Sequence, residues 1–158
     1  MSKTRQQIPN KNLLFRLAAL TRRWRQVLDA EFQSSGLTDA TWRPLLHLHH
    51  MGDGVRQKDL AASLGLEGPS LVRLLDTLIA KQLVLRTEDE SDRRAKLLAL
   101  TGQGRALVEV IQKRVGALEK EAFKSFSVAE LAQMADFVDR LEPAVNEVRS
   151  RLRLKESR

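Results

Sequence analysis

Apolar residues recur at helical spacing near the start of the chain. They follow one another at steps of four and three over residues 11–33. The members of this seam are Leu13, Leu17, Leu20, Trp24 and Val27. Such spacing places side chains on one face of an α-helix. Ser34, Ser35 and Gly36 follow the seam and predict the end of that helix.

Two further apolar seams lie in the C-terminal part of the chain. One covers residues 108–122, and the other, after the predicted N-cap Ser127, covers residues 131–152. Pro143 should kink or divide the second helix, because proline lacks an N–H group and its ring clashes with the preceding turn. Seams of this length exceed what a small central domain can cover. They predict a partner helix, most economically from a second copy of the chain.

A second helix is predicted to begin near Thr38, a good N-cap residue, with Asp39 in its first turn. Pro44 leaves two alternatives open. Either the helix starts at Thr41, which keeps Pro44 in the first turn, or it bends at Pro44. The Gly-Asp-Gly cluster at residues 52–54 then breaks it.

The centre of the chain is typical of two short helices followed by a hairpin. The predicted helices cover residues 57–64 and about 69–82, and the predicted strands cover residues 83–87 and 96–100. Gly65 suits a left-handed C-cap, and Pro69 suits a first helical position. The charged loop 88–94 joins the two strands.

This order of elements indicates a helix-turn-helix with a wing. Ala61 and Gly65 supply the small residue and the turn residue that the motif needs. One side of the second helix is apolar: Leu71, Leu74, Leu75 and Leu78. The other side is polar: Ser70, Arg73, Thr77 and Lys81. Such a helix fits the major groove of B-DNA, where arginine can bind guanine N7 and O6 bidentately. An ordinary helical hairpin is the alternative.

The charged loop ends in Asp92, Arg93 and Arg94. As a wing, this loop could place arginine along a neighbouring minor groove, with Asp92 orienting one guanidinium. A solvated turn in which these charges pair with one another is the alternative. That alternative is the better one for the loop taken without the two preceding helices.

Composition adds a charge argument to this pattern. The 158 residues suit one domain, and 27 basic against 20 acidic residues give a net charge of +7. A basic excess of this size favours a polyanionic partner such as nucleic acid, although it could simply aid solubility. The absence of cysteine excludes disulfides, thiol chemistry and Cys-based zinc sites. No secretory signal or membrane span is expected, and we expect a cytoplasmic protein.

Several of these residues together resemble the MarR family of winged-helix regulators, and especially its SlyA-like branch. Residues 68–76, Gly-Pro-Ser-Leu-Val-Arg-Leu-Leu-Asp, resemble the recognition helix, and residues 92–96, Asp-Arg-Arg-Ala-Lys, resemble the wing. Leu100-Thr101, Leu37-Thr38, Trp42 and Trp24-Arg25 extend the likeness over about residues 13–110. The resemblance implies a mainly α (α+β) fold. In it, residues 38–103 form a winged helix-turn-helix lobe, flanked by dimerisation helices over residues 11–36 and 104–153.

The resemblance also implies roles for individual residues in a homodimer bound to an operator. Ser70 and Arg73 would face bases in the major groove. Arg94 would enter the minor groove, with Asp92 holding it and Arg93 near the backbone. Two lobes on a two-fold axis should bind a pseudo-palindrome whose half-sites lie about one helical turn apart.

Many relatives bind small aromatic carboxylates or phenols in a cleft beside the dimerisation helices. Such a site needs a flat apolar wall and a fixed cation, which Trp42 and Arg22 could supply here. We place Thr38, Leu46 and His49 in the same cleft; the closest branch tends to carry histidine where this chain has Leu46. The alternative is that Trp42 is a core aromatic and Arg22 a solvated charge.

Three histidines cluster at His47, His49 and His50. His47 and His50 could share one metal ion on a helix, but carboxylates would have to complete the site. Ordinary helix-end histidines, or a polar member of the effector cleft, are the alternatives, and no metal or cofactor is expected.

Taken together, these features predict a dimeric, ligand-responsive regulator that binds double-stranded DNA. A DNA-binding anti-silencing factor without small-molecule control is one alternative, and a helical protein-interaction module is another. An enzyme is not expected, because the chain has no Gly-x-Ser-x-Gly context and no glycine-rich phosphate loop.

Overall fold

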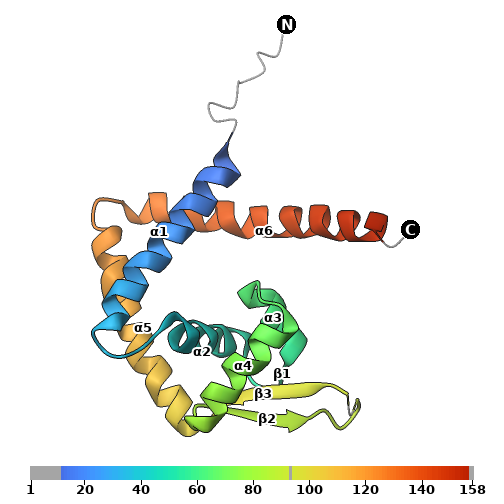
Figure 1. The fold of residues 1–158 in the computed structure, drawn as a ribbon. Helices are drawn as coiled ribbons and strands as arrows, with labels where there is room; N and C mark the ends of the chain where they lie inside the picture. Colours follow the sequence, from blue (N-terminus) through green and yellow to red (C-terminus); the bar gives the residue numbers. More distant parts are fainter. Residues whose placement is uncertain (1–11, 93, 157–158) are drawn as a thin grey trace, which may run out of the picture. The chain divides into compact units, whose positions relative to one another are not determined.

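The computed structural model describes residues 12–92 and 94–156. Its helices and strands follow in this order: α1 (Leu13–Gln33), α2 (Asp39–Met51), β1 (Val55–Arg56), α3 (Gln57–Leu64), α4 (Gly68–Ala80), β2 (Val84–Glu88), β3 (Lys96–Leu100), α5 (Gly102–Ala122) and α6 (Val128–Glu156). A first compact unit ends at Val115, and a second begins at Gly116 within α5. The fold is mainly helical with one small antiparallel sheet, as the sequence pattern predicted (Figure 1).

The core of the first unit is built from leucines of α2, α3 and α4 and from the sheet. The largest side chains that are completely buried there include Phe32, Leu45, Leu60, Leu71, Leu75 and Leu98. Each helix contributes them from one face only, so the opposite face of α4 stays in solvent. This arrangement predicts that most of the stability of the lobe comes from apolar burial.

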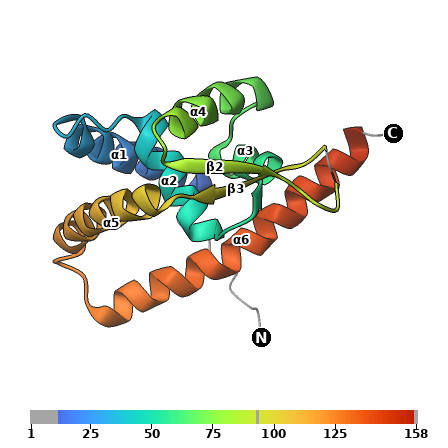
Figure 2. The same ribbon diagram turned by 90° about the horizontal axis from the view of Figure 1, so that it is seen from below.

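The sheet has the strand order β1-β3-β2, and both pairings are antiparallel. Strands β2 and β3 pair from Val84 with Leu100 to Glu88 with Lys96, which defines the predicted hairpin. Both views show these strands side by side (Figures 1 and 2). Strand β1 was not predicted, because two residues are too few to show a strand period.

The start of helix α2 rules out one of the two alternatives that Pro44 left open. The helix begins at Asp39, not at Thr41, and it continues through Pro44. The backbone amides of Thr41 and Trp42 donate to the Thr38 carbonyl at 2.8 and 3.0 Å, so the first turn closes before the proline is reached. Thr38 occupies the predicted N-cap position, although its side chain makes no capping hydrogen bond.

Helix α4 ends two residues earlier than predicted. Gln82 adopts a left-handed conformation with φ of 56°, and its amide donates to the Ile79 carbonyl. The Leu83 amide donates to the Leu78 carbonyl, which completes a Schellman motif. Gly65 ends α3 in the same way, with φ of 67°, as the sequence predicted.

The second unit contains the end of α5 and the long helix α6. Ser127 caps α6 as predicted: its hydroxyl and amide both donate to the Glu130 carboxylate, and the Glu130 amide donates back to the hydroxyl. Pro143 does not divide α6, which runs unbroken to Glu156. Apolar side chains remain exposed along this helix: Met134, Phe137, Val138, Val145, Val148 and Leu152.

Candidate nucleic-acid interface

Helix α4 presents the polar face that the sequence predicted. Ser70, Arg73 and Thr77 are exposed on this helix, and Lys81 is exposed at its C-cap. The Thr77 hydroxyl donates to the Arg73 carbonyl at 3.1 Å, and both residues are exposed. Because Leu71, Leu75 and Leu78 are completely buried on the other side, the helix cannot rotate without exposing its core face.

Helix α2 supports α3 from behind through polar contacts that the sequence did not reveal. The Arg43 guanidinium donates to the Leu64 carbonyl at 2.6 Å, where α3 ends and its last carbonyls lack helical partners. His47 Nδ1 lies 2.6 Å from the Ser63 hydroxyl. These two contacts hold the helix-turn-helix at the position where its turn begins.

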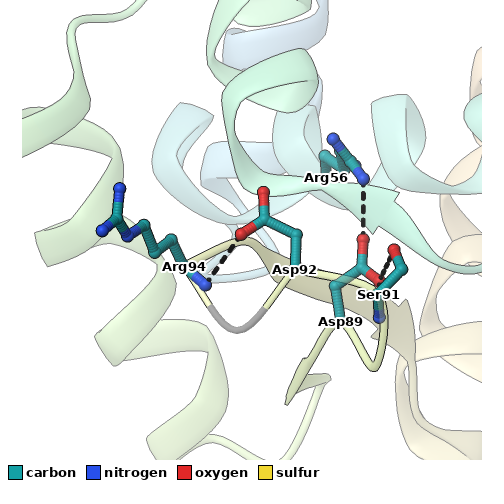
Figure 3. A network of polar contacts seen from close by, with 5 residues as sticks. All are labelled: Arg56, Asp89, Ser91, Asp92 and Arg94. Carbon is teal, nitrogen blue, oxygen red and sulfur yellow. Dashed lines mark hydrogen bonds and ion pairs between the residues drawn. The ribbon is translucent and has the colours of Figure 1, made fainter.

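The β2–β3 loop is a wing held by backbone and side-chain hydrogen bonds. Asp92 accepts a hydrogen bond of 3.1 Å from the Arg94 backbone amide (Figure 3). The structure therefore brings Asp92 and Arg94 together, but through the main chain and not through the guanidinium. Arg94 itself is exposed, and Arg93 lies outside the described residues.

Asp89 and Arg56 form an ion pair at the root of the wing, with Arg56 Nη2 2.8 Å from Asp89 Oδ2. Hydrogen bonds from the Ser91 hydroxyl and amide, and then from Arg56, lower the pKa of the Asp89 carboxyl below its usual value. This ion pair was not predicted from the sequence. The only available signal was an acidic residue within a loop that contains other acids.

A basic recess of about 340 Å³ opens between α3, the start of α4 and the wing. Its lining includes Arg56, Lys58, Gly68, Asp92, Arg94 and Lys96. Lys96 pairs with Glu88 at 2.5 Å, and Arg56 pairs with Asp89. The recess therefore joins the first turn of the recognition helix to the base of the wing, two parts that are separate in the sequence.

A family model described as the MarR family matches residues 35–95, which contain the helix-turn-helix and most of the wing. The transcriptional regulator PA3341 is 34% identical to this chain, with a TM-score of 0.74 over 83% of this chain and 96% of that one. The chain belongs to the MarR family.

Other solved structures have the same fold. A MarR family regulator from Rhodococcus sp. RHA1 is 28% identical, with a TM-score of 0.66 over 84% of this chain and 96% of that one. The transcriptional regulator SlyA is 21% identical, with a TM-score of 0.72 over 86% of this chain and 95% of that one. MarR proteins are DNA-binding winged-helix regulators and are generally not enzymes.

The residues predicted to form the effector cleft of this MarR protein are not all brought to one recess. Trp42 is 4% exposed, its Nε1 donates to Asp29 Oδ1 at 3.0 Å, and its ring lies 5.5 Å from that of Phe32. Leu46 is half-buried, while Arg22 and His49 are exposed.

A recess of about 470 Å³ lies where the end of α1 meets the start of α2. Thr38 lines it, together with Gln26, Asp29, Gln33, Leu37 and Asp39. Of the five predicted cleft residues, only Thr38 is among its lining residues. Arg22 lies one helical turn before Gln26 on α1, so the predicted cation is near this recess in sequence without lining it.

The histidine cluster shows no metal-binding arrangement. Within the described residues, no group of three or more His, Cys, Asp and Glu side chains is placed to hold a metal ion. His47 contacts Ser63, and the rings of His49 and His50 lie 5.7 Å apart edge to face. Among residues 12–92 and 94–156, no helix is long and apolar enough to cross a membrane.

Proposed function

We propose that this MarR-family chain is a dimeric regulator that binds a pseudo-palindromic operator through α4 and the wing. The observation that carries the proposal is the exposed polar face of α4 beside a basic recess that leads to Arg94. Ser70 and Arg73 contact bases in the major groove, and Thr77 and Lys81 extend this contact surface. Arg94 enters the minor groove, Asp92 shapes the loop that presents it, and Arg93 adds a backbone contact.

The proposed dimer uses the helices at the two ends of the chain. Residues 11–36 and 104–153 pair with a second copy, and residues 38–103 bind DNA. Exposed apolar residues support this division: Leu13, Leu14, Phe15 and Leu20 on α1 and Met134, Phe137, Val138 and Val145 on α6. The motifs at residues 68–76 and 92–96 support membership of the SlyA-like branch.

Small-molecule control by a phenol or aromatic carboxylate completes the proposal. The recess beside Thr38 is large enough for such a ligand, but the carboxylates of Asp29 and Asp39 line it. A neutral phenol is therefore preferred over a carboxylate at this recess, unless a cation such as Arg22 compensates the ligand charge. The buried, hydrogen-bonded Trp42 favours the alternative of DNA binding without small-molecule control.

The test is fluorescence anisotropy with the DNA upstream of the coding sequence and a scrambled duplex as control. Arg73→Ala and Arg94→Ala should each weaken specific binding by about 1–3 kcal/mol while the dimer persists. Arg140→Ala is a matched control, because this exposed arginine pairs with Asp136 on α6. Unchanged affinity for either variant would remove the role given to that arginine, and equal binding to both duplexes would contradict the operator.

Salicylate and phenol, added to the same binding reactions, separate the two forms of control. Release of the operator by either compound supports effector control, and stronger release by phenol supports the acidic recess as its site. Operator binding that ignores both compounds, and other simple aromatics, supports the regulator without small-molecule control.

A further inference from the structure

The Asp89 carboxylate uses both of its oxygens in contacts that join two parts of the fold. Oδ2 accepts from Arg56 Nη2 at 2.8 Å, and Oδ1 accepts from the Ser91 amide at 2.9 Å and from its hydroxyl at 2.6 Å (Figure 3). The Asp89 side chain is 12% exposed, and that of Arg56 is 37% exposed. A carboxylate so shielded from water is held by these partners more firmly than an exposed one.

The main chain of the wing depends on the same residue. The Asp89 amide donates to the Ala95 carbonyl, which closes the loop, and the Asp92 amide donates to the Asp89 carbonyl. The Ala95 amide then donates to the Asp92 carbonyl. Two consecutive turns thus lead from Asp89 to Arg94, so a displacement of Asp89 moves the residue that carries the guanidinium.

The other end of the ion pair lies at the root of the helix-turn-helix. Arg56 is the last residue of β1 and directly precedes α3, and its main chain pairs with Leu97 of β3. The ion pair therefore joins residues 33 positions apart and ties the loop of the wing to the start of α3.

We propose that Arg56, Asp89 and Ser91 form a clamp that positions the wing so that Arg94 reaches the minor groove. The Arg94 side chain extends away from this clamp and makes no contact with it in Figure 3. Asp89 and Arg56 are thus positioning residues, and Arg94 is the group that contacts DNA. The clamp rests on the proposed function, because it needs the wing to bind DNA.

The clamp and simple electrostatics predict opposite changes in DNA affinity when the Asp89 side chain is removed. An acidic side chain near a phosphate backbone repels it, so removing that charge alone should tighten DNA binding. If Asp89 is a clamp, its removal should weaken specific binding, because Arg94 is no longer held in place. The same change also frees Arg56, so a direct phosphate contact by Arg56 would again tighten binding.

The experiment measures operator affinity by anisotropy for Asp89→Ala, Arg56→Ala and the double variant. Each single variant should raise Kd about tenfold, and the double variant should raise it no further, because both changes break the same ion pair. Arg56→Lys should recover part of the affinity, since lysine can still pair with Asp89. Additive losses, or tighter binding by Asp89→Ala, would overturn the clamp.

Glu90→Ala is the matched control, because it removes the same charge one residue away. Glu90 is exposed and makes no hydrogen bond or ion pair with the residues that the structure describes. Its variant should bind the operator as tightly as the original chain or slightly more tightly. A tenfold loss for Glu90→Ala would attribute the effect to the loop in general and would also overturn the clamp.

Amide hydrogen exchange separates a displaced wing from a damaged fold. The Ser91 amide donates to Asp89, so it should exchange faster in Asp89→Ala and Arg56→Ala, while the buried strand residue Leu98 stays protected. Arg94→Ala distinguishes a failure of the clamp from a failure of the proposed wing contact with DNA. If Arg94→Ala loses affinity and the clamp variants do not, the clamp alone is wrong; if Arg94→Ala binds normally, the wing contact itself is wrong.

Discussion

His47 shows how one side chain links the support of the helix-turn-helix to pH. Its Nδ1 lies 2.6 Å from the Ser63 hydroxyl, across the contact between α2 and α3. Burial lowers the pKa of His47 below the ordinary 6.5, and nearby cations lower it further. The charged groups that act on it are Arg43, His50 and Arg25, which lower the pKa, and Asp39, which raises it. The neutral ring is therefore the form that the folded lobe favours.

This shift predicts a loss of stability on acidification. Because the folded pKa lies below the unfolded value, the unfolded chain binds more protons as the pH falls through 6.5. The free energy of unfolding should therefore fall from about pH 7.5 to about pH 5.5, and it should fall less in His47→Gln. Urea unfolding at both pH values measures the difference. Equal pH dependence in the two proteins would show that His47 does not contribute.

Helix α5 depends on a close backbone approach at its first turn. Gly104 is buried, and a Cβ atom there would overlap the carbonyl oxygen of Leu83. Thr101 caps the same turn: its hydroxyl donates to the Gln82 carbonyl at 2.6 Å and accepts from the Gly104 amide at 2.9 Å. The end of α4, the start of β2 and the start of α5 therefore meet at one crowded point.

We expect Gly104→Ala to lower the free energy of unfolding by about 1–3 kcal/mol, because the backbone must shift to admit the methyl group. Gly102→Ala is the control, since a Cβ atom at that position meets nothing within 4 Å. It should change stability by less than about 0.5 kcal/mol. Thermal or urea unfolding of the two variants compares them directly, and equal effects would contradict a steric cause.

At the scale of the molecule, α6 carries a seam of exposed apolar side chains. Val138 and Val145 are 55% and 44% exposed, and no residue of α6 whose side chain the structure describes is buried. An apolar face of this length is costly in water, so a second copy is the most economical partner.

Val138→Glu combined with Val145→Glu should convert the dimer into monomers, because two charges would be buried in the proposed interface. Specific DNA binding should fall as the dimer is lost, since two joined lobes are needed to bind two half-sites. Gln133→Glu with Asn146→Glu adds the same charge at exposed polar positions of α6 and should leave a dimer. Size-exclusion chromatography with light scattering measures the mass. A dimer in the first variant would place the interface elsewhere.

Much of this organisation could be predicted because it is local. The period of the apolar residues determined helices α1, α5 and α6, and Gly65 determined the end of α3, since a left-handed residue at that position favours glycine. The outward residues of α4 followed from the same period. One alternative for Pro44, a helix start at Thr41, was wrong, because the hydrogen bonds that close the first turn of α2 precede the proline.

Other features depended on which distant segments the fold brings together. Arg56 and Asp89 lie 33 positions apart, and Arg43 and Leu64 lie 21 positions apart. No local spacing in the sequence could therefore have predicted either contact. The burial of Trp42 was also decided by tertiary packing, because its fit against Phe32 and Asp29 of α1 depends on how two helices meet. The sequence by itself thus determined the helices, the hairpin and the residues that face solvent on α4. Only the tertiary structure decided the recess, the clamp and the support of the recognition helix, because each depends on contacts between distant parts of the chain.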